Sequence, residues 1–115
     1  MNYKLNDDHS VTKCTTEELI KELDDTYKTD KRTLGKDIIN GALISTVFLG
    51  IDHNFTNDGP PLIFETMVFY DSNSEDEQER YSTYDEAMAG HKKYVKKYSS
   101  FQMKIRMYIT AIFNL

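Results

Sequence analysis

Hydrophobic residues gather in two short runs near the middle of the chain. Residues 42–51 (ALISTVFLGI) and residues 62–70 (LIFETMVFY) are apolar, rich in β-branched and aromatic side chains, and nearly uncharged. Such runs are typical of β-strands. The segment between them, residues 52–61 (DHNFTNDGPP), cannot continue a strand because proline lacks the backbone amide. The pattern therefore predicts an antiparallel hairpin joined by this loop.

The N-terminal part predicts a short hairpin followed by a helix. In residues 2–14 (NYKLNDDHSVTKC), apolar and polar positions alternate on both sides of a turn-forming centre. Thr15 and Glu18 have the spacing of a capping box, and apolar residues then recur at helical spacing. We expect this helix to fade in the polar run 28–32, with Gly35 marking its stop.

A second helix is predicted near the C-terminus of the sequence. Thr83 and Glu86 have the spacing of another capping box. The residues expected on its apolar face are Tyr84, Ala87, His91, Tyr94, Val95 and Tyr98. Before this helix, the acidic run 71–79 (DSNSEDEQE) is typical of an exposed loop, with a short strand at Arg80 and Tyr81.

The tail, residues 101–113, alternates apolar residues with other residues, and this period of two favours a strand over a helix. An apolar edge strand of this kind can pair with a second copy, so a homodimer is one possibility. Together the elements predict an α+β fold, an antiparallel β-sheet with two α-helices, in one compact domain spanning residues 1–115.

Charge, cysteine content and apolar segment length predict the cellular location of the protein and the classes of partner that it binds. Residues 1–11 lack the apolar core of a signal peptide, no stretch reaches the roughly 18 apolar residues of a membrane helix, and the single cysteine, Cys14, cannot form an internal disulfide. We therefore expect a cytosolic protein without a membrane partner. The formal net charge of −5 disfavours direct nucleic-acid binding, which needs a basic surface.

The charges are unevenly distributed along the chain. Residues 71–86 hold seven acidic residues and one basic residue, whereas residues 91–107 hold six basic residues and no acidic one. Each block is either an interaction surface or a solvated surface. The acidic candidates for partner binding are Glu75, Asp76, Glu77 and Glu79.

Glu65 is the most unusual residue of the predicted hairpin, because a charge within an apolar strand is costly unless it is paired. If Gly50 lies opposite Glu65, the core face of the hairpin carries Leu43, Val47, Leu49, Ile51, Leu62, Phe64, Val68 and Tyr70. Glu65 then either accepts hydrogen bonds from a ligand or pairs within the protein, with Arg80, Lys93 or backbone amides of the loop.

The remaining ligand-type residues give no strong chemical motif. Asp52, His53, Glu65 and His91 are possible metal ligands, but neighbouring strand residues point to opposite faces, so Asp52 and His53 cannot both bind one ion without a bend. We therefore expect no metal and no cofactor. His91, on an apolar helix face, is either a site residue or a hydrogen-bonded core histidine. No catalytic motif is present, so we expect no enzyme.

Four motifs follow one another between residues 40 and 95. They are STVFLGIDHNF at 45–55, GPPLIFETMVF at 59–69, ERYST at 79–83 and AGH at 89–91. In this order they resemble a family of short proteins encoded by bacterial phages and prophages, over about half of the chain. The resemblance implies a phage accessory protein in the host bacterial cytosol that binds and disables a host factor. The family's shared polar positions fall on Asp52, His53, Glu65, Glu79, Arg80, Thr83 and His91.

Three functions follow from these observations. We favour an inhibitor of a host defence protein, such as an anti-CRISPR or other anti-defence protein, whose acidic run or basic 92–106 stretch contacts a nucleic-acid-binding effector. The alternative is a small-ligand binder, such as a sponge for a signalling nucleotide, with a pocket formed by His53, Glu65, Arg80 and His91. The least supported is an enzyme with His53 or His91 as its base.

Overall fold

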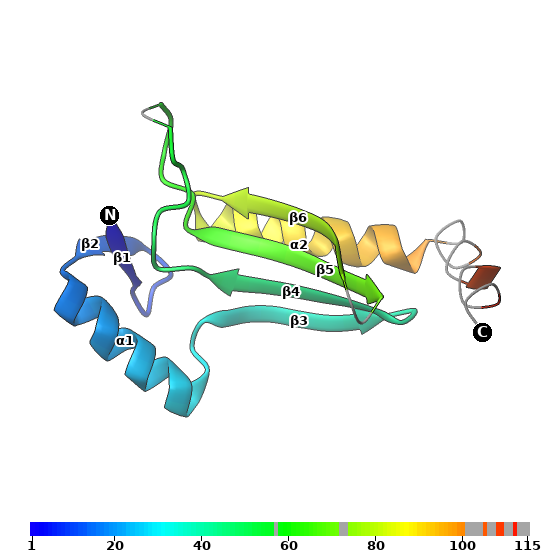
Figure 1. Cartoon of the computed structure of the whole chain (residues 1–115), viewed down its shortest axis with the longest axis horizontal. Coiled ribbons are helices and arrows are strands. Elements are labelled where there is room, and N and C mark those ends of the chain that lie inside the picture. The colour runs from blue at the N-terminus through cyan, green and yellow to red at the C-terminus, as the bar shows by residue number, and fades with distance from the viewer. Residues whose placement is uncertain (57, 72–73, 101–104, 106–107, 110–111, 113–115) are drawn as a thin grey trace.

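The computed structural model describes residues 1–56, 58–71, 74–100, 105, 108–109 and 112. The elements in chain order are β1 (Asn2–Leu5), β2 (Val11–Cys14), α1 (Thr16–Thr29), β3 (Thr33–Ile39), β4 (Ala42–Phe48), β5 (Phe64–Asp71), β6 (Ser74–Tyr81) and α2 (Tyr84–Ser99). Both sheets are antiparallel. The α+β prediction, with an antiparallel sheet and two helices, is confirmed (Figure 1).

The larger sheet has four strands in the order β3-β4-β5-β6, and α2 lies along one of its faces (Figure 1). We call the face against α2 the inner face and the opposite one the outer face. The predicted N-terminal hairpin is confirmed as β1 and β2, which lie with α1 beyond one end of the sheet (Figure 1). Because a strand alternates its side chains between two faces, each central strand contributes to both.

Inner-face side chains form the core, in two clusters. Near the start of α2 the cluster consists of Tyr3, Phe48, Ile63, Phe64, Tyr81 and Ala87. Along the later turns of α2 it consists of Ala42, Ile44, Val68, Tyr94 and Tyr98. The N-terminal hairpin therefore closes one end of the layer between sheet and helix, and α2 covers the rest.

The expected register of the central hairpin is wrong. Val47, not Gly50, lies opposite Glu65, a shift of three residues. An odd shift moves the opposed side chains to the other face, so Leu43 and Val47 lie on the outer face although Phe64 and Val68 are buried on the inner one. The cause is a shorter β4, which ends at Phe48 before Gly50 takes a positive φ of 79°.

Two elements differ from the expectations. Residues 33–39 form β3, whereas the sequence pattern placed the end of a fading helix there. The acidic run 71–79, expected as an exposed loop, contributes most of β6. In both cases the stabilising contacts come from elsewhere in the chain: Gly35 lies against the ring of His91, and the acids of β6 pair with lysines of α2.

The expected strand at residues 101–113 falls largely outside the described residues. Ile105, Tyr108, Ile109 and Ile112 are described, and all four are helical, so the strand is wrong at these positions. The homodimer suggested by that strand stays a prediction. Among the described residues, no helix is long and apolar enough to cross a membrane.

Candidate functional site

His91 is the centre of a buried hydrogen-bond chain on the inner face. The ring is only 7% exposed. Its Nε2 lies 2.6 Å from a carboxylate oxygen of Asp37 on β3, and its Nδ1 lies 2.7 Å from the hydroxyl of Thr46 on β4. The helix places His91 over Gly35, where an added Cβ would lie 2.9 Å from the ring. A side chain at residue 35 would therefore displace the histidine.

The chain continues across the sheet from Thr46. Its hydroxyl lies 2.6 Å from that of Thr66 on β5, which accepts a hydrogen bond of 3.1 Å from the phenol of Tyr81 on β6. One assignment of protons satisfies every group: Tyr81 donates to Thr66, Thr66 to Thr46 and Thr46 to Nδ1 of His91. His91 is then neutral and donates from Nε2 to the Asp37 carboxylate.

The order Asp37, His91 and Thr46 has the connectivity of a nucleophilic triad, in which a carboxylate orients a histidine that activates a hydroxyl. Nucleophilic attack also requires that the hydroxyl reach a substrate. Thr46 and its neighbour Thr66 are both 0% exposed beneath α2. The arrangement therefore satisfies buried polar groups, and His91 has the geometry of a hydrogen-bonded core histidine.

A row of ion pairs joins β6 to α2 at the edge of the inner face. Lys93 Nζ lies 2.6 Å from Glu79, and Lys97 donates to Glu77, which also accepts a 2.6 Å bond from the phenol of Tyr98. The hydrogen bond from Lys93 lowers the pKa of Glu79. Burial alone would raise the pKa of Glu77, but the bonds from Lys97 and Tyr98 outweigh it and the pKa is lowered.

Two of the four acidic partner-binding candidates are thus engaged within the protein. Glu77 and Glu79 face α2 and hold it to the sheet, and each is part of a salt bridge. The side chains of Glu75 and Asp76 lie outside the described part of the structure. Glu65, on β5, lies on the opposite face of the sheet.

Glu65 forms a pair with Arg80 on the outer face. The carboxylate is 6% exposed and accepts hydrogen bonds from Arg80 Nε at 2.8 Å and from Gln78 Nε2 at 2.6 Å. Pairing within the protein, and with Arg80 in particular, was one of the alternatives the sequence left open. The arginine side chain is about one-third exposed, so it reaches the surface of the molecule.

Asp52 and His53 lie apart from both groups, in the loop between β4 and β5. A carboxylate oxygen of Asp52 accepts the backbone amides of Asn54 at 2.7 Å and Leu62 at 2.9 Å, and these bonds lower its pKa. His53 donates from Nδ1 to the carbonyl oxygen of Ile51 at 2.8 Å. Since Glu65 and His91 occupy opposite faces of the sheet, the structure does not bring His53, Glu65, Arg80 and His91 into one pocket.

The outer face is an apolar surface that the sequence pattern did not reveal. No described helix or strand packs on it. Ile38 is 73% exposed, and the other apolar residues on this face, all partly exposed, are Leu43, Val47, Met67 and Phe69. The exposed polar residues beside them are Lys36, Gln78 and Arg80. The misplaced register concealed this surface, because it assigned Leu43 and Val47 to the core.

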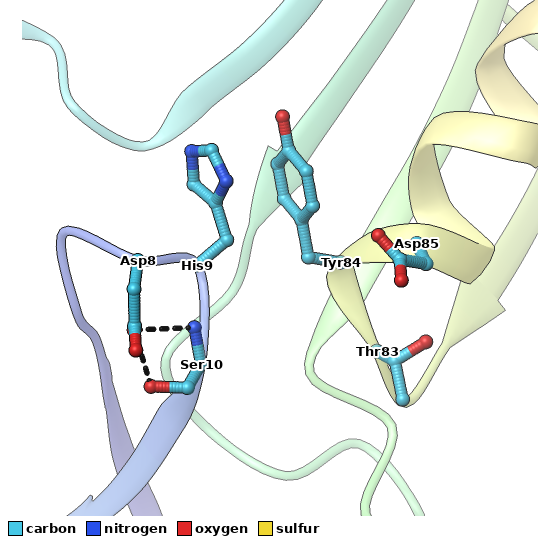
Figure 2. A pocket seen from close by; sticks show the side chains of 6 residues that line it. All are labelled: Asp8, His9, Ser10, Thr83, Tyr84 and Asp85. Carbon is cyan, nitrogen blue, oxygen red and sulfur yellow. Dashed lines mark hydrogen bonds between the residues drawn. The ribbon is translucent and has the colours of Figure 1, made fainter.

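A shallow cavity lies where the β1–β2 turn meets the start of α2. Its volume is about 290 Å³, and its lining residues are Asp8, His9, Ser10, Thr83, Tyr84 and Asp85 (Figure 2). The rings of His9 and Tyr84 stack at 3.8 Å, and Asp8 accepts two hydrogen bonds from Ser10. Thr83 caps α2 by accepting the amide of Glu86. These polar groups therefore serve the turn and the helix cap.

Comparison with known proteins finds no family model, no curated protein and no solved structure that matches this chain. The described residues contain no group of three or more His, Cys, Asp or Glu side chains placed to hold a metal ion. The two features that distinguish the structure are the buried hydrogen-bond chain on the inner face and the exposed apolar surface on the outer face.

Proposed function

We propose that this protein acts by binding another protein through the outer face of its four-stranded sheet. The observation that carries the proposal is the composition of that face. An antiparallel sheet with one face in water normally alternates apolar residues inside with polar residues outside. Here the uncovered face bears Ile38, Leu43, Val47, Met67 and Phe69 around the single small polar residue Ser45, and exposed apolar surface of this kind marks interaction sites.

Polar groups flank the apolar centre in a way that suits a protein interface. Lys36 on β3 and Arg80 on β6 lie at the two edge strands, and Arg80 is held in place by Glu65. An apolar centre with a polar rim is the usual anatomy of such interfaces. The cationic rim favours a partner surface that is acidic at its edges. Burial of Thr46 and His91 supports binding over turnover.

The proposed biological setting comes from the resemblance of the sequence to phage and prophage accessory proteins. It supports an inhibitor of a host factor, such as an anti-CRISPR or other anti-defence protein, acting in the bacterial cytosol. The alternative, a sponge for a signalling nucleotide, is distinguished by what co-purifies with the protein. A host protein supports the inhibitor, whereas a bound nucleotide supports the sponge.

The test is quantitative affinity capture from bacterial cells, followed by native mass spectrometry of the eluted complex. The test variant is Ile38→Lys/Met67→Lys on the outer face, and the control is Lys13→Glu/Lys21→Glu at exposed positions of β2 and α1. We expect the captured partner to decrease about 10-fold or more with the first variant and to persist with the second. Equal capture by both variants and the parent protein would overturn the proposal.

A further inference from the structure

The loop between β4 and β5 presents an aromatic side chain to solvent. The loop rises away from the sheet (Figure 1), and its described residues are 49–56 and 58–63. Phe55 is 85% exposed, the highest value among the exposed large hydrophobic residues of the described chain. The ring of His53 lies beside it, with centroids 5.9 Å apart. Ile51, whose carbonyl oxygen bonds to His53, is 47% exposed.

Side-chain hydrogen bonds organise the backbone around Phe55. Asn54 Nδ2 donates to the carbonyl oxygens of Asp58 at 2.8 Å and Pro60 at 3.0 Å, and its Oδ1 accepts the amide and the hydroxyl of Thr56 at 3.1 and 2.6 Å. Asp52 accepts two further backbone amides at the base of the loop. Asparagine and aspartate side chains that bond to nearby backbone in this way fix turns.

The stability of the folded state does not explain an exposed phenyl ring on a loop fixed by hydrogen bonds. An exposed phenyl ring gains almost nothing for the folded state, because the hydrophobic contribution depends on area removed from water. Yet residues on both sides of Phe55 are held by hydrogen bonds. A preorganised loop loses little entropy when it binds, and aromatic residues in desolvated pockets carry much of the free energy of protein interfaces.

We propose that Phe55 is an anchor that inserts into an apolar pocket of a protein partner. The inference rests on the proposed function and names a contact made outside the sheet face. His53 donates from Nδ1 to the carbonyl oxygen of Ile51, so its Nε2 is the ring atom that can hydrogen-bond to the pocket rim. Exposed Asp58 in the same loop and the net charge of −5 favour a basic rim and disfavour an anionic membrane or nucleic acid.

The test uses the whole chain with p-benzoylphenylalanine in place of Phe55 or, as a control, in place of exposed Lys21 on α1. After irradiation in bacterial cells, we expect a defined protein adduct from position 55 and at least about 10-fold less of it from position 21. The captured protein, once purified, should bind Phe55→Ala about 30-fold more weakly than the parent chain. Binding by Phe55→Tyr should stay within a few-fold of the parent value.

The other outcomes overturn the inference in distinguishable ways. If a partner is captured through the sheet face but position 55 gives no adduct and Phe55→Ala binds normally, the anchor is wrong and the proposed function stands. If neither surface captures a protein, both fail. Phe55-dependent binding to phosphatidylcholine vesicles, or an adduct to nucleic acid, would replace the protein partner with another class. A loss of thermal stability in Phe55→Ala of more than about 5 °C would make the ring structural.

Discussion

The two faces of the four-stranded sheet differ in how their polar groups are used. On the inner face, the hydroxyls of Thr46 and Thr66, the phenol of Tyr81 and the ring of His91 form one hydrogen-bond chain that ends at Asp37. On the outer face, the Glu65–Arg80 pair, with Gln78, stands beside an open apolar surface. The same strands thus form an inner face whose polar groups are hydrogen-bonded to one another and an outer face whose apolar side chains are open to water.

The contrast separates residues that hold the fold from residues that are free to bind. Buried polar groups are costly to leave without partners, so the inner chain behaves as one structural unit. The outer face carries apolar area that the described chain leaves open to water. The residue types that most often carry chemistry are therefore used within the fold and not on the proposed binding surface. His91 and the two threonines belong to the hydrogen-bond chain. Asp37, Glu77 and Glu79 each pair with a residue of α2.

The largest effect on stability is expected from adding a side chain where α2 packs closely against β6. A Cβ on Gly90 would lie 2.0 Å from the phenolic oxygen of Tyr81 and 2.3 Å from its Cζ. Gly90→Ala should therefore destabilise the protein by about 3 kcal/mol, although alanine is intrinsically favoured in helices by about 1 kcal/mol. Denaturant unfolding measures the change.

The matched control is Ala89→Gly at the adjacent exposed position, which should cost only about 1 kcal/mol through helix propensity. A Gly90→Ala variant as stable as the parent protein, or more stable, would show that α2 does not pack this closely on Tyr81.

The next effect concerns the hydrogen-bond chain itself. Thr46→Val keeps the shape of the side chain but leaves His91 Nδ1 and Thr66 without their shared partner, so we expect a loss of about 2 kcal/mol. Thr66→Val should destabilise the Thr46→Val variant less than it destabilises the parent protein, because the two hydroxyls bond to each other. A double-mutant cycle by chemical denaturation measures this coupling, and strict additivity would contradict a connected chain.

A smaller effect is expected from acid. The pKa of Glu79 and the pKa of Asp52 are lowered below their ordinary values of 4.5 and 3.8. A group with a lowered folded pKa contributes stability above its unfolded pKa, and this is lost as pH falls through the folded pKa. Stability should therefore hold from pH 7 to about pH 5 and decline below about pH 4.5.

Glu79→Gln should weaken that decline and cost less than about 1 kcal/mol at pH 7, because the Lys93 pair is solvent-screened. The readout is the free energy of unfolding across the pH range, with Glu17→Gln on exposed α1 as a control. Identical acid profiles for Glu79→Gln and the parent protein would remove the pair as a source of the pH dependence.

The smallest effect on stability is expected on the outer face. Ile38→Lys replaces a side chain that is 73% exposed, so the free energy of unfolding should change by no more than about 0.5 kcal/mol. Differential scanning calorimetry checks this. A loss above about 1.5 kcal/mol would mean that Ile38 is covered in the native state, by the tail or by a second copy.

Much of the fold could be predicted from local patterns, and the failures have physical causes. The capping box at Thr15 forms with both of its reciprocal bonds. At Thr83 the hydroxyl caps the helix by accepting the Glu86 amide, and it also bonds to the Glu86 carboxylate. β3 and most of β6 were missed because their polar residues are stabilised by α2 from a distance, which no local window contains. The register failed because β4 ends earlier than its apolar composition suggests.

The candidate site was predicted only in part. The pairing of Glu65 with Arg80 and the core position of His91 were both among the stated alternatives, because buried charges and apolar helix faces constrain their residues. That these residues lie on opposite faces depended on register. The outer apolar surface could not be predicted without the correct register either. The exposure of Phe55 follows from the conformation of its loop, which composition does not determine.

The most direct test of this division of the sheet is a calorimetric titration of the captured partner into Met67→Lys, on the outer face, and Thr46→Val, on the inner face. Both titrations are made at a temperature where each variant is folded. We expect Met67→Lys to lose measurable binding and Thr46→Val to bind within about twofold of the parent protein. Retained binding by Met67→Lys, together with lost binding by folded Thr46→Val, would contradict a binding surface on the outer face.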